Sequence, residues 1–347
     1  MKVLHMLQSD KFSGAENVVC QIISMCKHED VEFSYSSQDG QIREALEERN
    51  IAFYPIRKMA VSEFKRVIKE VNPDIIHAHD MGASFFAALA CGKIPIISHI
   101  HNNAINSRGF SVKSLLYYIA AKKANQIFWV SQSSFDGYAF HSLFKEKSTV
   151  LYNIIDINVL TEKMRLDVNS YDFDVVYLGR LTSPKNPQRL IEVISKVVAK
   201  RPSTQVAVIG TGDLEAEIKK LVVDRRMEEN VKFLGFQKNP TKILHDAKVM
   251  IMTSRWEGTP MCALEAMALG VPIVSTPTDG LRELVDVGIT GYLSNDNDVL
   301  AEKICLYISD DRLRKEASEN SIKKARLIND LDKYRKVIMS AYKRIMK

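Results

Sequence analysis

The segment that decides the fold of this chain is Ser254-Arg255-Trp256-Glu257-Gly258-Thr259-Pro260-Met261-Cys262-Ala263-Leu264-Glu265-Ala266-Met267. It follows an apolar run, Val249–Met252, that is typical of a buried strand. Gly258 favours a tight turn, and Pro260 suits the first position of a helix, where a backbone N–H is not needed. The segment therefore predicts a strand, a turn and a helix in direct succession.

Two glutamates of this segment are spaced to hold a ligand. Glu257 lies in the turn, and Glu265 lies two helical turns along. A helix rises about 1.5 Å per residue, so the carboxylates are separated by roughly the length of a sugar nucleotide. The backbone N–H groups of Gly258, Thr259 and Met261 stand where a helix N-terminus favours an anion. These residues alone are equally consistent with an ordinary strand–turn–helix that has two surface glutamates and binds no ligand.

Length and composition indicate a globular protein with two domains. A chain of 347 residues can form two cores, and 46% hydrophobic with 26% charged residues is typical of globular proteins. The formal net charge of +6 is too small to indicate a nucleic-acid partner. The five cysteines are scattered and form no Cys-x-x-Cys, which favours reduced thiols. No signal segment and no long apolar run is present, so we expect a cytoplasmic protein without a membrane span.

Short apolar runs alternate with amphipathic segments along both halves of the chain. The runs predict strands at residues 3–7, 31–36, 51–54, 74–79, 94–100, 127–130, 149–152, 174–178, 205–209, 231–234 and 249–252. The amphipathic segments predict helices at residues 17–26, 42–48, 61–71, 110–124, 187–200 and 331–346. Such alternation is typical of parallel sheets covered by helices. We therefore predict an α/β protein of two doubly wound, Rossmann-like parallel-sheet domains, with sites beyond the carboxyl ends of the strands.

Glycine-marked loops follow three strands of the second half. The run Gly179-Arg180-Leu181-Thr182-Ser183-Pro184-Lys185-Asn186 places a guanidinium and an ammonium where they suit a diphosphate leaving group. Gly210-Thr211-Gly212-Asp213 is a turn of the phosphate-binding type, and Gly235-Phe236 follows a third strand. Taken singly, each loop is also consistent with a plain turn bearing surface charge.

Two features of the first half carry polar groups at strand ends. Ser13-Gly14-Ala15-Glu16 joins a strand to a helix and can hold a phosphate at the helix N-terminus. The pairs His77/His79 and His99/His101 each share one face of a strand, because alternate residues point the same way. A zinc site would need a third ligand. Packed or hydrogen-bonded histidines are the simpler interpretation.

Together these motifs resemble those of the retaining family 4 glycosyltransferases of the GT-B type. In that pattern the first glycine of Gly-Gly-x-Glu is replaced here by Ser13, and the glycine of Asn-Gly-Ile-Asp is replaced by Ile154. The resemblance rests on residues 13–16, 99–102, 153–156, 179–186, 257–274, 279–283 and 288–292.

The resemblance implies a role for each candidate residue. Glu265 is expected to bind the ribose hydroxyls, and Glu257 to lie beside the donor sugar and stabilise the transition state. Arg180 and Lys185 are expected to stabilise the leaving diphosphate, and His101 to lie near the donor sugar. The remaining expected donor-binding residues are Gly14, Asn153, Gly179, Gly212, Gly235, Phe236, Gly258, Thr259 and Met261.

The same resemblance implies a domain plan. Residues 1–160 would bind the acceptor and residues 173–328 the nucleotide sugar, facing each other across a cleft and joined by a linker at residues 161–172. A C-terminal helix at residues 329–347 is expected to return to the first domain.

The activity implied is transfer of a hexose from a nucleoside-diphosphate sugar, with uridine the commonest base in the family. The acceptor would be a glycan or a lipid-linked oligosaccharide of bacterial surface polysaccharide synthesis. We expect retention of configuration and neither a metal nor another cofactor. Two alternatives stay open, a nucleotide-sugar epimerase on the same plan and a catalytically silent nucleotide-sugar binder, although Glu257, Glu265, Arg180 and Lys185 together disfavour silence.

Two Asp-x-Asp triplets invite a metal-dependent interpretation. Asp172-Phe173-Asp174 opens a strand and so lies at its amino end, away from the expected site. Asp296-Asn297-Asp298 lies in a polar loop before a helix. We therefore expect neither triplet to bind a metal.

One stretch of the first half is strongly basic. Its helix at residues 110–124 mixes lysines with apolar side chains. Such a helix either packs its apolar face on the sheet or lies on the anionic inner surface of the cell membrane, and both interpretations stay open. Between residues 82 and 145 the single acidic residue is Asp136, and the basic residues are Lys93, Arg108, Lys113, Lys122, Lys123 and Lys145.

Overall fold

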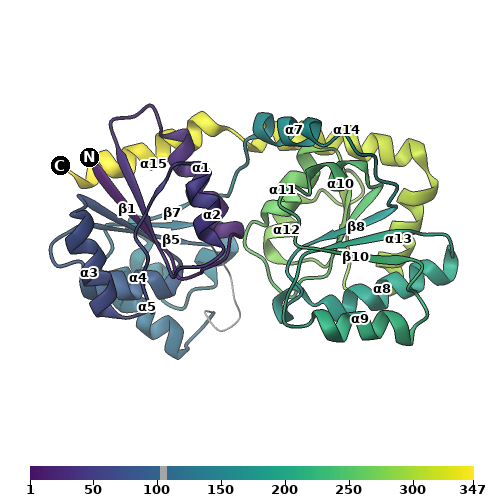
Figure 1. Cartoon of the computed structure of the whole chain (residues 1–347), viewed down its shortest axis with the longest axis horizontal. Helices are drawn as coiled ribbons and strands as arrows, with labels where there is room; N and C mark the ends of the chain where they lie inside the picture. The colour runs from purple at the N-terminus through teal and green to yellow at the C-terminus, as the bar shows by residue number, and fades with distance from the viewer. Residues whose placement is uncertain (102–107) are drawn as a thin grey trace. The chain divides into compact units, whose positions relative to one another are not determined.

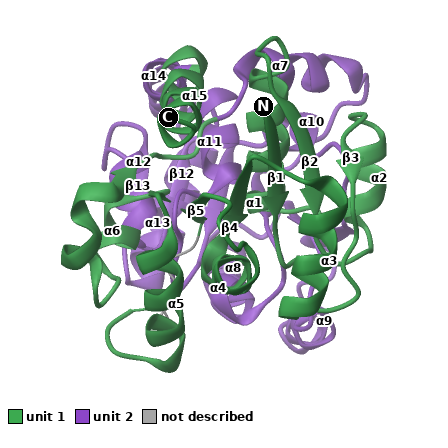
Figure 2. Cartoon of the chain, turned by 90° about the vertical axis from the view of Figure 1, so that its left-hand side faces the viewer, with its two compact units in different colours: residues 1–154, 331–347 green, residues 155–330 purple. Residues whose placement is uncertain are grey.

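The computed structural model describes residues 1–101 and 108–347. The chain divides into two compact units, Met1–Ile154 with Leu331–Lys347 and Ile155–Asp330, which Figure 2 colours separately. This division precedes the linker predicted at residues 161–172, because helix α7 (Ile157–Leu166) fills the start of that segment and belongs to the second unit. The C-terminal helix α15 (Leu331–Ile345) belongs to the first unit.

The first unit is built on a seven-stranded parallel sheet with the order β3-β2-β1-β4-β5-β6-β7. Its central strands β4 and β5 are buried along their whole length, which is why they read as apolar runs interrupted only by histidine and serine. The strands are β1 (Lys2–Met6), β2 (Glu32–Ser36), β3 (Ala52–Phe53), β4 (Ile75–His79), β5 (Ile96–Ile100), β6 (Gln126–Trp129) and β7 (Ser148–Val150).

Helices cover both faces of this sheet (Figure 1). α3, α4 and α5 pack in a row on one face, and α1 packs against α15 on the other. A hydrogen bond between Tyr342 and His77 and one from Arg344 to Gln126 tie α15 to strands of the sheet. The helices are α1 (Gly14–Met25), α2 (Ile42–Glu47), α3 (Val61–Val71), α4 (Asp80–Ala90), α5 (Val112–Lys123), α6 (Gln132–Asp136) and the 3-10 helix η2 (His141–Lys147).

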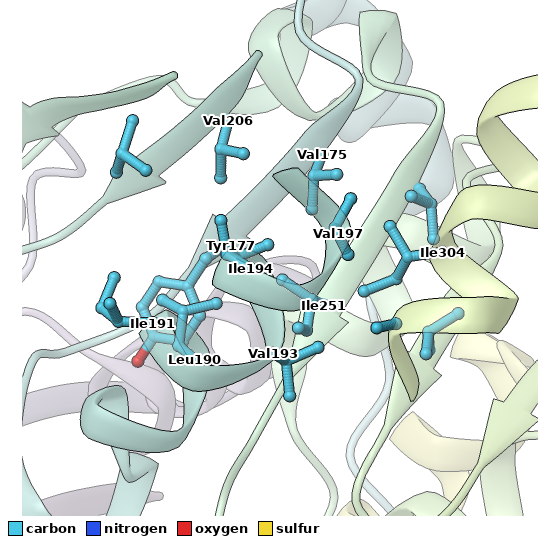
Figure 3. Packing of buried hydrophobic residues seen from close by; sticks show 14 of the residues in the cluster. Val175, Tyr177, Leu190, Ile191, Val193, Ile194, Val197, Val206, Ile251 and Ile304 are labelled. Carbon is cyan, nitrogen blue, oxygen red and sulfur yellow. The ribbon is translucent and has the colours of Figure 1, made fainter. Parts of the chain in front are cut away.

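The second unit is built on a six-stranded parallel sheet with the order β10-β9-β8-β11-β12-β13. Figure 3 shows one side of its core, where Val175, Val206 and Ile251 of the sheet pack against Leu190 of α8 and Ile304 of α13. The strands are β8 (Val175–Leu178), β9 (Val206–Ile209), β10 (Val231–Gly235), β11 (Val249–Met252), β12 (Ile273–Ser275) and β13 (Gly291–Leu293).

The helices of this unit also lie on both faces of its sheet (Figure 1). α8 packs against α13 and α9, whereas α11 packs against α14, α12, α10 and α7. The remaining helices are η3 (Ser183–Lys185), α8 (Pro187–Lys200), α9 (Glu215–Asp224), α10 (Thr241–Asp246), α11 (Met261–Ala268), α12 (Asp279–Leu284), α13 (Asn297–Ser309) and α14 (Asp311–Ile328).

Both sheets reverse their strand order between two central strands. The reversal falls between β1 and β4 in the first unit and between β8 and β11 in the second. Loops leaving the carboxyl ends of such a pair diverge and leave room for a ligand. In each unit the chemistry is therefore expected just beyond the ends of these two strands.

The predicted fold class, two parallel-sheet α/β domains, is confirmed. α1 begins at Gly14, three residues before the predicted start, because the carboxylate of Glu16 accepts hydrogen bonds from the backbone and hydroxyl of Ser13 and caps the helix. The sequence prediction lacks β12 and β13, whose three residues each are too few to show a period.

Candidate functional site

The centre of the candidate site in the second unit is an ion pair between Lys185 and Glu257. Lys185 follows β8 and Glu257 follows β11, so the pair bridges the two strands where the sheet order reverses. Nζ of Lys185 lies 2.5 Å from Oε1 of Glu257, and the same oxygen accepts a hydrogen bond from Ser254 Oγ at 2.6 Å. The two side chains are 19% and 11% exposed, so water screens the pair only in part. The sequence motifs that contain Lys185 and Glu257 are thus brought together.

Neighbouring charges keep this lysine ionised. Burial lowers the pKa of Lys185, but the carboxylate of Glu257 outweighs burial, and the net pKa is raised. The positive charge of Arg180 is close enough to lower the pKa of Lys185 in part. Because the Arg180 side chain is exposed, an anion at this edge of the sheet meets two cations.

Glycines let the loops after β8 and β9 come together. A Cβ on Gly210 would lie 2.1 Å from the carbonyl oxygen of Gly179, and one on Gly212 would lie 2.2 Å from that of Leu181. Gly210 also has a φ of +125°, which L side chains rarely adopt. Any larger residue at these positions would separate the two loops.

The loops after β11 and β12 meet in the same way. The Thr276 hydroxyl donates to the Ser254 carbonyl at 2.7 Å. A Cβ on Gly280 would lie only 1.3 Å from the carbonyl oxygen of Gly258. The turn that contains Glu257 is therefore held by backbone contact with the start of α12.

Helix α11 carries Glu265. It begins at Met261, and Pro260 is the N-cap with φ −71° and ψ 122°, one residue before the predicted role of Pro260 as the first helical residue. Thr259 and Met261 are buried. Burial raises the pKa of the partly buried Glu265 to about 7, against the opposing charge of Lys163 on α7. Near neutral pH this carboxyl exists in both forms.

An exposed aromatic ring follows β10. Gly235 ends that strand with a φ of +64°, and its carbonyl accepts the N–H of Gly210 at 2.7 Å. The next residue, Phe236, is 64% exposed. An exposed ring beside a glycine turn is suited to stacking on a nucleotide base.

Gly14 and Asn153 lie at strand ends of the first unit. Gly14 is the first residue of α1, beyond β1, and the capping carboxyl of Glu16 is buried, which raises its pKa. Asn153 is buried and follows β7. Both positions are at the carboxyl edge of the parallel sheet, where the sequence analysis expects them.

His101 belongs to a network that the sequence shows only in part. It follows β5, and its Nε2 lies 2.8 Å from Nδ1 of His79, whose Nε2 lies 2.9 Å from Nδ1 of His5. The backbone N–H of His101 donates to Asp80 at 2.9 Å. The sequence analysis misses His5, because only the strand order brings β1 beside β4. Asn102, the last residue of the His-x-His-Asn motif, lies outside the described residues.

The Asp-x-Asp triplets have structural contacts of their own. Asp174 accepts hydrogen bonds from Lys248 at 2.7 Å and from the backbone of Gln205 at 2.9 Å, at the amino end of β8. Asp296 is the N-cap of α13, and Asp298 pairs with Lys196 at 2.7 Å. Asp174, Asp296 and Asp298 therefore each have a structural role.

The two halves of the chain match two glycosyltransferase models. Residues 12–159 match the model described as Glycosyltransferase Family 4, and residues 161–324 match the model described as Glycosyl transferases group 1. The two matched regions together span most of the chain.

Characterised and uncharacterised relatives are also glycosyltransferases by name. An uncharacterized glycosyltransferase of Methanocaldococcus jannaschii is 28% identical over 242 residues, 63% of this chain and 60% of that one. The Escherichia coli enzyme named UDP-Gal:alpha-D-GlcNAc-diphosphoundecaprenol alpha-1,3-galactosyltransferase is 24% identical over 86% of this chain and 85% of its own length. The chain thus spans less than two thirds of the first relative.

Solved structures show the same fold. HepE of Anabaena, crystallised with UDP and glucose, superimposes with a TM-score of 0.87 at 22% identity, over 99% of this chain and all of that one. With parallel sheets in both units and a glycosyltransferase model matched by each half, the chain belongs to the family 4, group 1 glycosyltransferases and has the GT-B fold.

Proposed function

We propose that the chain transfers a sugar, with retention of configuration, from a uridine-diphosphate sugar to a glycan or lipid-linked oligosaccharide. The observation that carries this proposal is the Lys185–Glu257 pair at the reversal of the second sheet. Arg180 lies beside it, and Glu265 follows on the next helix. Two cations for a diphosphate and two carboxyl groups for sugar and ribose are the groups that a nucleotide sugar needs.

In the proposed reaction the bond between the sugar and the diphosphate breaks, and negative charge develops on the leaving oxygen. Lys185 and Arg180 carry their charges before the reaction starts, so they stabilise that oxygen without reorganisation. Glu257, fixed by Lys185 and Ser254, would face the positive charge that develops on the sugar. The acceptor oxygen would bond to the anomeric carbon on the face that the diphosphate leaves, and the leaving phosphate would accept the proton of that hydroxyl. These side chains, rather than a metal ion, are proposed to stabilise the leaving group, and His101 is proposed to contact the donor sugar.

The names of similar proteins support the donor and acceptor classes. The Escherichia coli relative uses UDP-galactose and a diphosphoundecaprenol-linked sugar by its name. A Staphylococcus aureus relative, 28% identical over 55% of this chain and 45% of its own length, is named poly(ribitol-phosphate) alpha-N-acetylglucosaminyltransferase. The first name gives a lipid-linked sugar as the acceptor and the second a poly(ribitol-phosphate), and the lipid-linked sugar is of the acceptor class that we propose here.

Incubation with labelled UDP-sugars, with and without lipid-linked acceptors, tests the function. A transferase should hydrolyse the matching donor slowly when alone and glycosylate an acceptor when one is present. Conversion of the sugar to its epimer without an acceptor would instead identify an epimerase. Binding without any turnover across the panel would identify a silent binder, and either result would contradict the proposal.

Glu265→Ala should weaken binding of UDP by roughly 1.5–3 kcal/mol, which is about 10- to 150-fold, because two ribose hydroxyls would lose a charged acceptor. Titration calorimetry with UDP measures this loss. Glu265→Gln keeps the shape of the side chain and should lose only part of the affinity. Unchanged affinity in the alanine variant would contradict the assignment of Glu265 to the ribose.

The raised pKa of Glu265 adds a control within the same experiment. The ionised carboxylate is the stronger acceptor, so UDP affinity should be full well above the pKa of about 7 and should fall as the pH drops through it. Between pH 8 and pH 6 we expect roughly a tenfold loss. Lys163 and Cys262 are the titratable groups that interact with Glu265. Glu265→Gln should remove the pH dependence that comes from Glu265 and leave any that comes from Lys163 or Cys262.

The exposed face of α5 supports a proposal about location. The buried face of this helix consists of Ser114, Tyr117, Ala120 and Ala121, so the large apolar residues face outward instead of packing on the sheet. Lys122 and Lys123 are exposed on the same helix. The exposed apolar residues are Phe110, Val112, Leu115, Leu116 and Ile119.

We propose that this face rests on an anionic inner leaflet, where a cytoplasmic enzyme would reach a lipid-linked acceptor. No helix among the described residues is long and apolar enough to cross a membrane. Partly inserted apolar side chains flanked by lysines are suited to peripheral contact.

Replacing Lys113, Lys122 and Lys123 by Glu should abolish flotation with phosphatidylglycerol vesicles at low salt and leave UDP binding intact. Each basic residue near an anionic leaflet contributes about 1 kcal/mol, so reversing three charges has a large effect. The matched control reverses Lys336, Lys343 and Lys347 near the C-terminus, on or just beyond α15 of the opposite sheet face, and should still float. Equal flotation of all three proteins, or none by the wild type, would contradict the membrane proposal.

A further inference from the structure

Five histidines gather at the reversal of the first sheet. His5 comes from β1, His77 and His79 from β4, His99 from β5, and His101 from the residue after β5. The first four are fully buried or nearly so. Parallel pairing sets His5 opposite His77 and His79 opposite His99, so the rings are neighbours by register.

Three of these rings form a hydrogen-bonded row. His101 Nε2 lies 2.8 Å from His79 Nδ1, and His79 Nε2 lies 2.9 Å from His5 Nδ1. Ring centroids along the row are 5.1 and 5.2 Å apart with interplanar angles of 22° and 28°, so adjacent rings meet edge to edge. The other two rings stack on this row at 4.4 Å (His77 on His79) and 4.3 Å (His99 on His101).

This row does not favour a metal ion, although nitrogens of two triads lie within 4.8 Å of one another. Both ring nitrogens of His79, which is a member of both triads, are used in the row. His77 uses its Nδ1 at 2.8 Å from the Tyr342 hydroxyl. Coordination needs lone pairs that converge on one point, and the stacked rings direct theirs in near-parallel planes.

A row of three neutral imidazoles has two proton arrangements. In one, His5 Nδ1–H donates to His79, His79 Nδ1–H donates to His101, and His101 carries its proton on Nδ1. In the other, every proton points the opposite way, and His5 carries its proton on Nε2. The state of one end of the row therefore determines the state of the other.

The surroundings of the two ends decide between these arrangements. His5 Nε2 and His101 Nδ1 are both buried and have no hydrogen-bond partner among the described residues, so each arrangement leaves one N–H without a partner in the protein. The charge of Asp80 distinguishes the two ends, because its carboxylate accepts the backbone N–H of His101 at 2.9 Å and favours a proton on the His101 ring.

Asp80 also has an uncommon backbone conformation. Its φ is +65°, in the left-handed region that aspartate tolerates better than most residues. Its carboxylate favours a proton on the nearby edge of the His101 ring. Burial lowers the pKa values of His5, His79 and His101, in keeping with three neutral rings.

We infer that His5 and His79 are positioning residues that hold His101 as a neutral imidazole with its proton on Nδ1. His101 thereby offers a hydrogen bond from Nδ1 to an oxygen of the bound substrate. That last step rests on the proposed sugar transfer, whereas the tautomer is a property of the free protein. His5 acts on His101 through His79 and has no substrate contact of its own in this scheme.

Long-range ¹H–¹⁵N correlation spectra of the imidazoles measure the tautomer directly. Uniformly labelled full-length protein contains eight histidines, and His101 is assigned by difference with His101→Gln. We expect a single neutral tautomer with the proton on Nδ1 in the wild type. In His5→Phe, which leaves the ring of His79 without its far partner, we expect a mixture of both tautomers at His101.

Two variants separate the hydrogen-bonded row from general disturbance of the cluster. His5→Asn, whose amide can donate from near the position of Nδ1, should restore the single tautomer. Tyr342→Phe removes the hydrogen bond to His77, outside the row, and should leave His101 unchanged. A proton on Nε2 in the wild type would overturn the inference, as would an unaltered His101 in a folded His5→Phe variant. The spectra are recorded without a nucleotide sugar. They would therefore stay valid even if the protein did not catalyse the proposed transfer.

Discussion

Lys185→Ala should lower the rate of sugar transfer by about 10²–10³-fold at saturating donor, the loss expected when one preorganised charge-stabilising group is removed. The physical reason is that, in the proposed reaction, Lys185 would meet charge that grows only as the bond to the diphosphate breaks, so its effect should fall on kcat more than on KM. The lysine is 19% exposed, so its interaction with the leaving group is only partly screened by water. Steady-state kinetics on the matching UDP-sugar measures both constants.

Two controls separate catalysis from folding. Lys200→Ala removes an exposed lysine from the end of α8 in the same unit and should leave kcat unchanged. The double variant Lys185→Ala/Glu257→Gln removes both charges of the pair. Comparing its kcat with that of Lys185→Ala shows how much of the loss comes from leaving the Glu257 carboxylate unpaired. A Lys185→Ala enzyme that keeps its kcat would contradict the proposed role. So would one that loses kcat only in proportion to the fraction unfolded.

Added chelator should have little effect on the same assay, because Arg180 and Lys185 are proposed to stabilise the diphosphate. Activity that vanishes with EDTA and returns with manganese would contradict the metal-free proposal. The Asp-x-Asp triplets would then need a second examination, despite the contacts of Asp174 with Lys248 and of Asp298 with Lys196.

The fold could be predicted because parallel strands buried on both faces leave plain apolar runs. Helices α3 and α8 have the bounds predicted for them, since each combines an amphipathic repeat with a clear beginning and end. The segment predicted as a linker begins inside α7, a helix in which Leu160 is the one buried residue. Burial alone does not guarantee detection either, since β12 is buried throughout but has only three residues.

The sequence could predict the single residues of the candidate site but not which of them contact one another. Lys185 and Glu257 each stand in a recognisable motif, yet their contact depends on β8 lying beside β11, which the strand order alone decides. His5 stands in no motif and enters the histidine row only because β1 pairs with β4. The outward face of α5 is also decided by packing, since Ala120 and Ala121 fit with the ring of Tyr117 against the body of the unit, whereas the larger aliphatic residues of the helix are exposed.

Gly280→Ala should lower the free energy of unfolding of the second unit by about 3 kcal/mol, at the upper end of the usual cost of overpacking. The added Cβ would lie 1.3 Å from the carbonyl oxygen of Gly258, which belongs to the backbone and cannot rotate away. The contact can be relieved only if α12 or the turn around Gly258 moves. That turn holds Glu257 in its bond to Lys185, so UDP binding should be lost together with stability.

Gly288→Ala provides the matched control for this substitution. Gly288 has a φ of +81°, but its added Cβ would meet nothing within 4 Å, so its cost is conformational strain of about 1–2 kcal/mol. The unfolding temperature should be highest for the wild type, lower for Gly288→Ala and lowest for Gly280→Ala. Calorimetry should show UDP binding by the wild type and Gly288→Ala but not by Gly280→Ala. If Gly280→Ala bound UDP as tightly as Gly288→Ala does, the turn around Gly258 would not depend on its contact with α12. The position of Glu257 would then be set by Lys185 and Ser254 instead.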